Sequence, residues 1–194
     1  MNIDNNEFLL SEYFERMDKE IKSILSRPTK NIYRFEILDT EQSIKNKAVI
    51  LEEKQYQMKV GEIWQLVLGN YPGCVNLKNG HRSGLDIISD TRKFAIELKN
   101  RTNTDNASSR KSNLDKLSNY KKEHPDYACI LGCINADTEK KTLSGSKKEI
   151  LHNSVKIEYR VGYDLLRFIL RDDVDKIIDF VKNRVKTYRF TIEI

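Results

Sequence analysis

Residues 83–99 of this sequence read SGLDIISDTRKFAIELK. Apolar residues dominate segments 85–89 and 94–99, and the polar segment 90–93 between them has the length of a hairpin loop. The pattern predicts two antiparallel strands in which Ser89 pairs with Phe94. Counting outward from this pair places Asp86 directly opposite Glu97.

The predicted hairpin has two chemically different faces, because successive side chains of a strand point to opposite sides. Asp86, Glu97 and Lys99 share one face with Ile88 and Ala95. Leu85, Ile87, Phe94, Ile96 and Leu98 share the other face.

Two opposed carboxylates destabilise an otherwise apolar hairpin, since directly opposed β-carbons lie about 5 Å apart. A divalent cation between them removes this conflict, and carboxylate oxygens with retained water suit Mg²⁺. Lys99 on the same face can orient the attacking water or meet charge that develops on a phosphate. These are the parts that phosphodiester hydrolysis requires, so the hairpin predicts a Mg²⁺-dependent nuclease.

The segments Gly84-Leu85-Asp86 and Glu97-Leu98-Lys99 resemble the active-site signature of the PD-(D/E)xK nuclease superfamily. Ser83-Gly84 stands where that signature often has a proline. The resemblance implies that Asp86, Glu97 and the backbone carbonyl of Leu98 bind the metal and that Lys99 is the catalytic lysine. It also implies an acid on the preceding helix, and Glu62 is the matching residue; an ordinary solvent-facing acid is the alternative for Glu62.

The continuation, ELKNRTNTDN at residues 97–106, resembles a group of type II restriction endonucleases that we associate with cutting GGNCC. This resemblance covers about residues 60–135. It implies a homodimer that cuts double-stranded DNA at a short, near-palindromic site and leaves 5′-phosphate ends.

The charge of the chain is concentrated in one segment. Lys and Arg number 34 and Asp and Glu number 29, and the whole excess lies within residues 99–122. Residues 100–113 predict a polar loop facing DNA, in which Arg and Asn suit bases and Ser, Thr and Lys suit phosphates; a solvated loop is the alternative. The candidate DNA contacts are Arg82, Asn100, Arg101, Asn103, Asn106, Arg110 and Lys111.

Outward from the hairpin, hydrophobic periodicity predicts helices over 8–25 and 44–68 and a helix that begins at Ser112 as N-cap. A nearly all-apolar strand over 127–134 is expected to lie parallel to 94–99 through a right-handed crossover. A strand over 155–159, helices over 163–170 and 173–185, and a strand over 188–194 follow. The expected fold is α/β, bordering on α+β: a restriction-endonuclease-like mixed sheet flanked by helices, in one nuclease domain (1–194) with its catalytic core at about 60–135.

Composition excludes several other classes of protein. Of the 194 residues 39% are hydrophobic and 32% charged, and no apolar run is long enough to span a bilayer. The first residues lack the basic and apolar regions of a secretory signal. The three cysteines, at 74, 129 and 133, lack metal-ligand spacing and predict reduced thiols in a cytoplasmic protein.

Two rival functions remain open at this point. A structure-selective or repair nuclease of the same superfamily would cut only at junctions or ends. A non-catalytic DNA-binding module with a vestigial acidic pair would bind DNA in a salt-sensitive way without Mg²⁺-dependent nicking.

Overall fold

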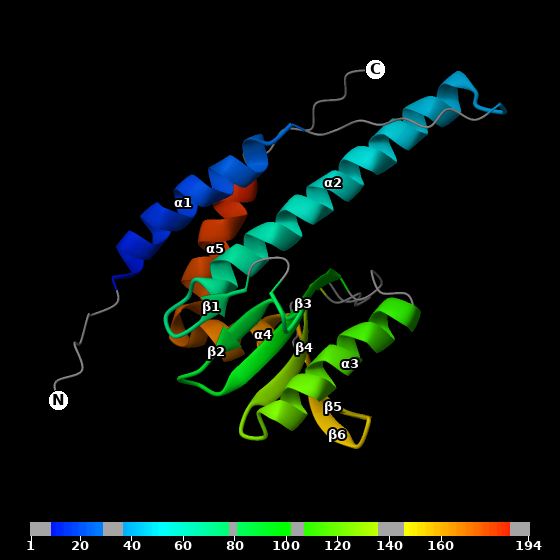
Figure 1. The fold of residues 1–194 in the computed structure, drawn as a ribbon. Helices are drawn as coiled ribbons and strands as arrows, with labels where there is room; N and C mark the ends of the chain where they lie inside the picture. The colour runs from blue at the N-terminus through cyan, green and yellow to red at the C-terminus, as the bar shows by residue number, and fades with distance from the viewer. Residues whose placement is uncertain (1–8, 29–36, 78–80, 102–106, 136–145, 187–194) are drawn as a thin grey trace.

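The computed structural model describes residues 9–28, 37–77, 81–101, 107–135 and 146–186. A six-stranded mixed sheet in the order β1-β2-β3-β4-β6-β5 lies between helices on both faces (Figure 1). The strands are β1 Val75–Asn76, β2 Ile87–Ser89, β3 Phe94–Arg101, β4 Ala128–Asn135, β5 Ser146–His152 and β6 Val155–Val161. The helices are α1 Leu10–Ser26, α2 Glu41–Gly69, α3 Ala107–Glu123, α4 Tyr163–Leu170 and α5 Val174–Val185, with a 3₁₀ turn over Arg171–Asp173. The α/β class expected from the sequence is confirmed.

The central hairpin has the predicted register. Its pairs run from Ser89 with Phe94 to Ile87 with Ile96, and residues 90–93 form the turn. The next strand, β4, is parallel to β3, so the predicted crossover through α3 is also confirmed.

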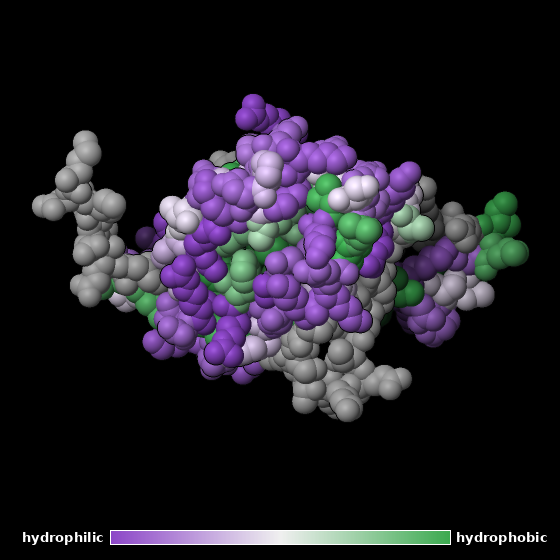
Figure 2. Space-filling model, turned by 90° about the horizontal axis from the view of Figure 1, so that it is seen from below, coloured by the Kyte–Doolittle hydropathy of each residue, from purple (hydrophilic) through white to green (hydrophobic). Residues whose placement is uncertain are grey.

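Apolar side chains on the two faces of the sheet form two separate cores. Ile87, Phe94 and Ile96 pack under α1, α2, α4 and α5. Ala95 and Ile88 belong to the other core, which α3 covers with Leu114 and Leu117. Seen from below, where α3 and the β5–β6 hairpin lie in Figure 1, hydrophilic side chains dominate the surface (Figure 2).

The long helix α2 is defined by signals at both ends. At its start the Thr40 hydroxyl accepts a hydrogen bond from the Ser43 amide (3.1 Å) and the Ser43 hydroxyl accepts one from the Thr40 amide (2.8 Å), which satisfies two free donors. Its end lies just before Pro72, which cannot continue a helix. Among the described residues, no helix has the length and apolar character needed to cross a membrane.

Two local predictions were wrong. Helix α3 begins at Ala107, so Ser112 lies inside the helix and residues 107–113 are not part of a loop. This stretch lacks Gly and Pro, so nothing stops the helix that Leu114 and Leu117 anchor from extending toward its N-terminus. Leu85 packs in the α3-side core rather than with Ile87, because the chain turns at Gly84 (φ +64°) and β2 begins only at Ile87.

The strand β5 has no counterpart among the sequence-based expectations. It pairs antiparallel with β6 at the edge of the sheet, and its charged residues obscure the alternation of a half-buried strand. The expected strand over 188–194 lies outside the described residues.

Candidate active site

Asp86 is fixed against β3 by its backbone and by its side chain. Its amide donates to the Ile96 carbonyl (3.0 Å), and its carboxylate Oδ2 accepts a hydrogen bond from the Leu98 amide (2.7 Å). The carboxylate therefore takes the place of a backbone acceptor where the β2–β3 ladder ends. Asp86 lies beside Glu97, the next residue of β3, as the register predicts.

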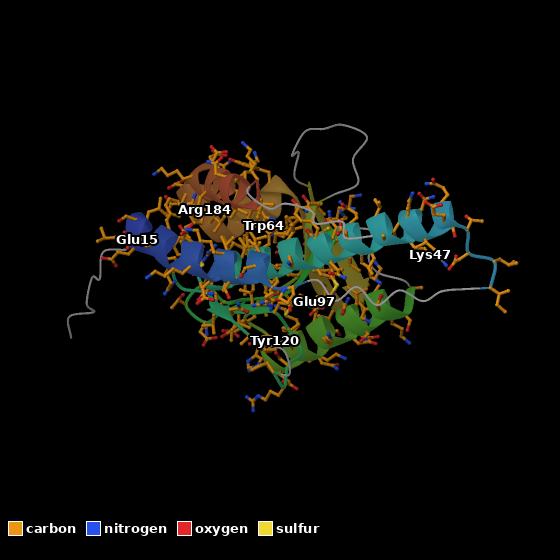
Figure 3. All side chains as sticks on the ribbon, turned by 90° about the horizontal axis from the view of Figure 1, so that it is seen from above. Glu15, Lys47, Trp64, Glu97, Tyr120 and Arg184 are labelled. Atoms are coloured by element: carbon orange, nitrogen blue, oxygen red, sulfur yellow. The ribbon has the colours of Figure 1, made fainter. Side chains whose placement is uncertain are left out.

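Glu97 carries the buried carboxylate of the site. Glu97 is only 4% exposed and lies between α2 and α3 (Figure 3). One oxygen, Oε1, accepts a hydrogen bond from Lys99 Nζ (2.8 Å) and lies 3.7 Å from Lys116 Nζ of α3. The other oxygen, Oε2, is buried and has no hydrogen-bond partner within the part of the chain that the structure describes.

The surroundings of Asp86 disfavour its charged form. Burial, followed by the charge of Glu97, raises the pKa of Asp86 to about 6. The Leu98 amide, Lys99 and Lys116 lower this pKa but do not offset the rise. Two carboxylates are thus held close together in a poorly solvated place, which is the conflict inferred from the sequence.

The donor set fits a hard divalent cation. A buried carboxylate oxygen without a partner is costly unless it binds something, and here it lies beside a second carboxylate with a raised pKa. In the described ranges no group of three or more His, Cys, Asp or Glu residues could hold a metal. Two carboxylates with free positions for water and phosphate oxygen match the way in which Mg²⁺ is usually bound.

The structure does not bring Glu62 to this pair of acids. Its carboxylate accepts two hydrogen bonds from Arg27, just after α1, at 2.6 and 2.8 Å. The face of α2 toward the site carries Gln57, Gly61 and Gln65 instead. Gln57 accepts from the Asn100 side chain, Gly61 lies against Asn100, and Gln65 donates to Leu77.

The residues predicted to contact DNA lie in different environments: some are exposed, and others contact neighbouring elements of the protein. Arg82 and Lys111 are exposed, and Arg110 lies over the Tyr159 ring at 5.6 Å. Asn100 binds Gln57 and Asn135, and Arg101 lies 3.5 Å from Glu53, so both hold the end of β3 in place. Asn103 and Asn106 lie outside the described residues.

Lys116 is the site residue that sequence reasoning missed. The sequence shows it only as one of several basic residues in 99–122. A usable signal was present, because Lys116 directly precedes the buried Leu117 on the crossover helix that follows β3. Such a lysine lies at the border of the buried face, where its ammonium can reach the sheet.

Comparison with known protein families identifies the chain. Residues 13–167 match the model of the Eco47II restriction endonuclease family. The chain belongs to this family. A comparison with curated proteins found no match. Family membership makes the protein a type II restriction endonuclease, a site-specific deoxyribonuclease that binds double-stranded DNA, and it removes the non-catalytic DNA-binding module as an explanation.

Within this Eco47II-family chain, the matched range includes the hairpin, α2, α3 and β4. All the side chains that surround Glu97 therefore belong to the family match.

Proposed function

We propose that this Eco47II-family endonuclease depends on Mg²⁺ and cuts at the carboxylate pair of the β2–β3 hairpin. The observation that carries the proposal is Glu97 Oε2, which is buried beside Asp86 without a hydrogen-bond partner among the described residues. Asp86, Glu97 and the backbone carbonyl of Leu98 would hold the cation. When bound, the cation supplies Lewis-acid activation of a water molecule and of the phosphate.

The chain's own groups perform the remaining tasks. Lys99, already hydrogen-bonded to Glu97, orients the water and meets the charge that develops on the phosphate. The water oxygen forms a bond to phosphorus and gives up a proton. The bond from phosphorus to the 3′ oxygen breaks, and the 3′ oxygen takes up a proton from solvent. This leaves a 5′-phosphate and a 3′-hydroxyl.

Recognition of DNA is assigned to a homodimer acting on a near-palindromic site, with GGNCC as the proposed sequence. Arg82, Arg110 and Lys111 are exposed and are proposed as contacts to DNA. Sedimentation of the purified protein tests the dimer, which has twice the 22.7 kDa mass of one chain. Finding only a monomer in the free protein, and only one protein chain per duplex in the complex with a short duplex, would exclude the dimer.

The decisive experiment uses unmethylated phage DNA, Mg²⁺ and sequencing of the fragment ends. We expect discrete fragments with 5′-phosphates whose ends share GGNCC. Another shared sequence would overturn only the proposed specificity, whereas cutting confined to junctions or ends would favour a structure-selective nuclease.

The variant Glu97→Gln tests the site itself. It removes the charge but keeps the shape of the side chain, so we expect cleavage to fall by at least about 10³-fold while DNA binding persists. The matched control is Glu149→Gln on the edge strand β5, an exposed residue paired with Lys156 at 3.4 Å. Full Mg²⁺-dependent cleavage by the Glu97→Gln protein would refute the assignment.

The role of Glu62 stays a prediction, and Glu62→Gln tests it in the same cleavage assay. A loss of about 10²-fold or more would make Glu62 part of the catalytic machinery. A rate within about threefold of the wild type, together with a small loss of stability, would assign Glu62 to its exposed ion pair with Arg27.

A further inference from the structure

A groove opens beside the hairpin on the side of α3. Its volume is about 800 Å³, and Arg82, Lys116, Tyr120 and His124 are among the residues that line it. Glu123 is the acidic residue among the described lining residues, so cationic and neutral groups predominate. With Arg82 and Lys116 against Glu123, the groove carries a small excess of positive charge, which is the sign that a phosphate backbone requires.

Lys116 connects this groove to the carboxylates. Its side chain lines the groove, and its Nζ lies 3.7 Å from Glu97 Oε1. Gly84 makes room for it: a β-carbon at Gly84 would lie 3.2 Å from Cε of Lys116, and the φ of +64° at this position suits glycine. The chain therefore lets this lysine reach the site from the groove.

Lys99 and Lys116 approach the same carboxylate from different directions. Lys99 is hydrogen-bonded to Glu97 at 2.8 Å and borders a small hollow with Arg101 and Arg110. Lys116 is beyond hydrogen-bonding distance of Glu97 and borders the groove that Arg82 also lines. Basic side chains thus line two hollows: Arg82 and Lys116 line the groove, and Lys99, Arg101 and Arg110 line the small hollow.

We propose that Lys116 is a second lysine of the active site, which enters from α3 and contacts the DNA phosphate at the carboxylate pair. The inference rests on the proposed function. A cation held by Asp86 and Glu97 would supply the positive charge that Glu97 otherwise draws from Lys99 and Lys116. Lys116, which is not hydrogen-bonded to Glu97, then meets a non-bridging phosphate oxygen on the groove side, where it offsets developing charge.

The test compares Lys116→Met, which keeps the aliphatic stem over Gly84, with Lys116→Gln and Lys116→Arg. Lys176→Met is the control, since it removes the same charge from an exposed position on α5, on the other side of the sheet. Two quantities are measured: the single-turnover rate on phage DNA with saturating enzyme and Mg²⁺, and the salt dependence of binding to a random-sequence duplex with Ca²⁺ in place of Mg²⁺.

We expect Lys116→Met and Lys116→Gln to cut about 10²- to 10³-fold more slowly, and Lys116→Arg to recover at least about tenfold of that loss. The slope of log K against log salt should become shallower by about 1 in the Met and Gln variants. The control should keep the wild-type rate within about threefold and the wild-type slope. Thermal unfolding identifies any variant that fails to fold. If either the Met or the Gln variant fails to fold, the remaining one is compared with the wild type.

Wild-type rate and slope in either folded variant would overturn the proposal. A slower rate with an unchanged slope would also overturn it, because Lys116 would then act only through Glu97. If the wild type cuts no DNA, the proposed function fails, while the slope comparison still decides whether Lys116 contacts phosphate.

Discussion

Asp86 and Glu97 hold negative charge where water can stabilise it little. Asp86 receives one backbone hydrogen bond, and Glu97 keeps one oxygen without a hydrogen-bond partner in the described part of the chain. Lys99 and Lys116 offset part of this charge. At the scale of single residues, the site is arranged for a ligand rather than for stability of the empty protein.

Asp86→Asn is expected to stabilise the protein when divalent cations are absent. The folded protein raises the pKa of Asp86 from its usual value near 4 to about 6, so folding favours the protonated form. The contribution of Asp86 to the free energy of unfolding therefore declines as pH rises from about 4 to about 6 and is constant above that range. The amide oxygen of Asn can still accept the hydrogen bond from the Leu98 backbone amide. Because the Asn side chain has no charge, it avoids this decline in stability.

Urea unfolding in EDTA measures the effect. At pH 8 we expect the free energy of unfolding to rise by about 2 kcal/mol, and at pH 4 the difference should nearly vanish. Asp126→Asn, at an exposed residue paired with Lys93, is the matched control and should change little at either pH. An equal gain at both pH values would show that charge on Asp86 is not the cause.

At the scale of elements, β3 connects all parts of the site. It pairs with β2 on one side and β4 on the other, and Asn100 near its end binds Gln57 of α2 and Asn135 of β4. The strand β4 is in turn pressed against α4, because Gly132 leaves space for the side chain of Leu165. Close packing on β4 therefore helps to hold β3, with which it pairs.

Gly132→Ala and Gly61→Ala should have opposite effects on stability. A β-carbon at Gly132 would lie 2.9 Å from Leu165 Cδ2, so we expect the free energy of unfolding to fall by about 1–3 kcal/mol. At Gly61, within α2, the nearest atom would be Asn100 Cβ at an ordinary 3.5 Å. There Ala should add about 0.5–1 kcal/mol through helix propensity. Denaturant midpoints measure both, and loss of stability in the Gly61 variant would contradict the packing described here.

At the scale of the whole molecule, the sheet separates two cores, and the carboxylates lie with the core that α3 covers. This side carries the groove, the exposed Arg82 and the basic residues of α3. The opposite side is covered by α1, α2, α4 and α5, which supply most of the apolar core. Most of the apolar core thus lies on one face of the sheet, and the proposed DNA contacts lie on the other.

A divalent cation is expected to stabilise the whole molecule, because it binds the folded site and not the unfolded chain. At a concentration about 100 times its dissociation constant, the gain is about 2.7 kcal/mol. Thermal unfolding with Mg²⁺ or Ca²⁺ should show a raised midpoint in the wild type and in Glu149→Gln, but not in Glu97→Gln. The rise should shrink below about pH 6, where a proton on Asp86 competes with the cation. An equal rise in Glu97→Gln would place the cation elsewhere.

The sequence by itself determined the hairpin, its register and the shared face of Asp86, Glu97 and Lys99. Each follows from the two-residue period of side chains along a strand and from a loop of fixed length. Both are properties of one continuous segment. The parallel strand β4 could be predicted equally well, because a strand that is buried on both faces has a continuous apolar sequence.

Only the tertiary structure decided which distant side chains meet that face. Lys116 reaches Glu97 because α3 packs over the sheet and the chain turns at Gly84, while Glu62 pairs with Arg27 because α1 ends beside α2. The position of Leu85 was misjudged for the same reason, because α3 supplies the core in which Leu85 packs. Local periodicity fixes what a segment can bury, but the approach of one element to another depends on how all the side chains between them pack.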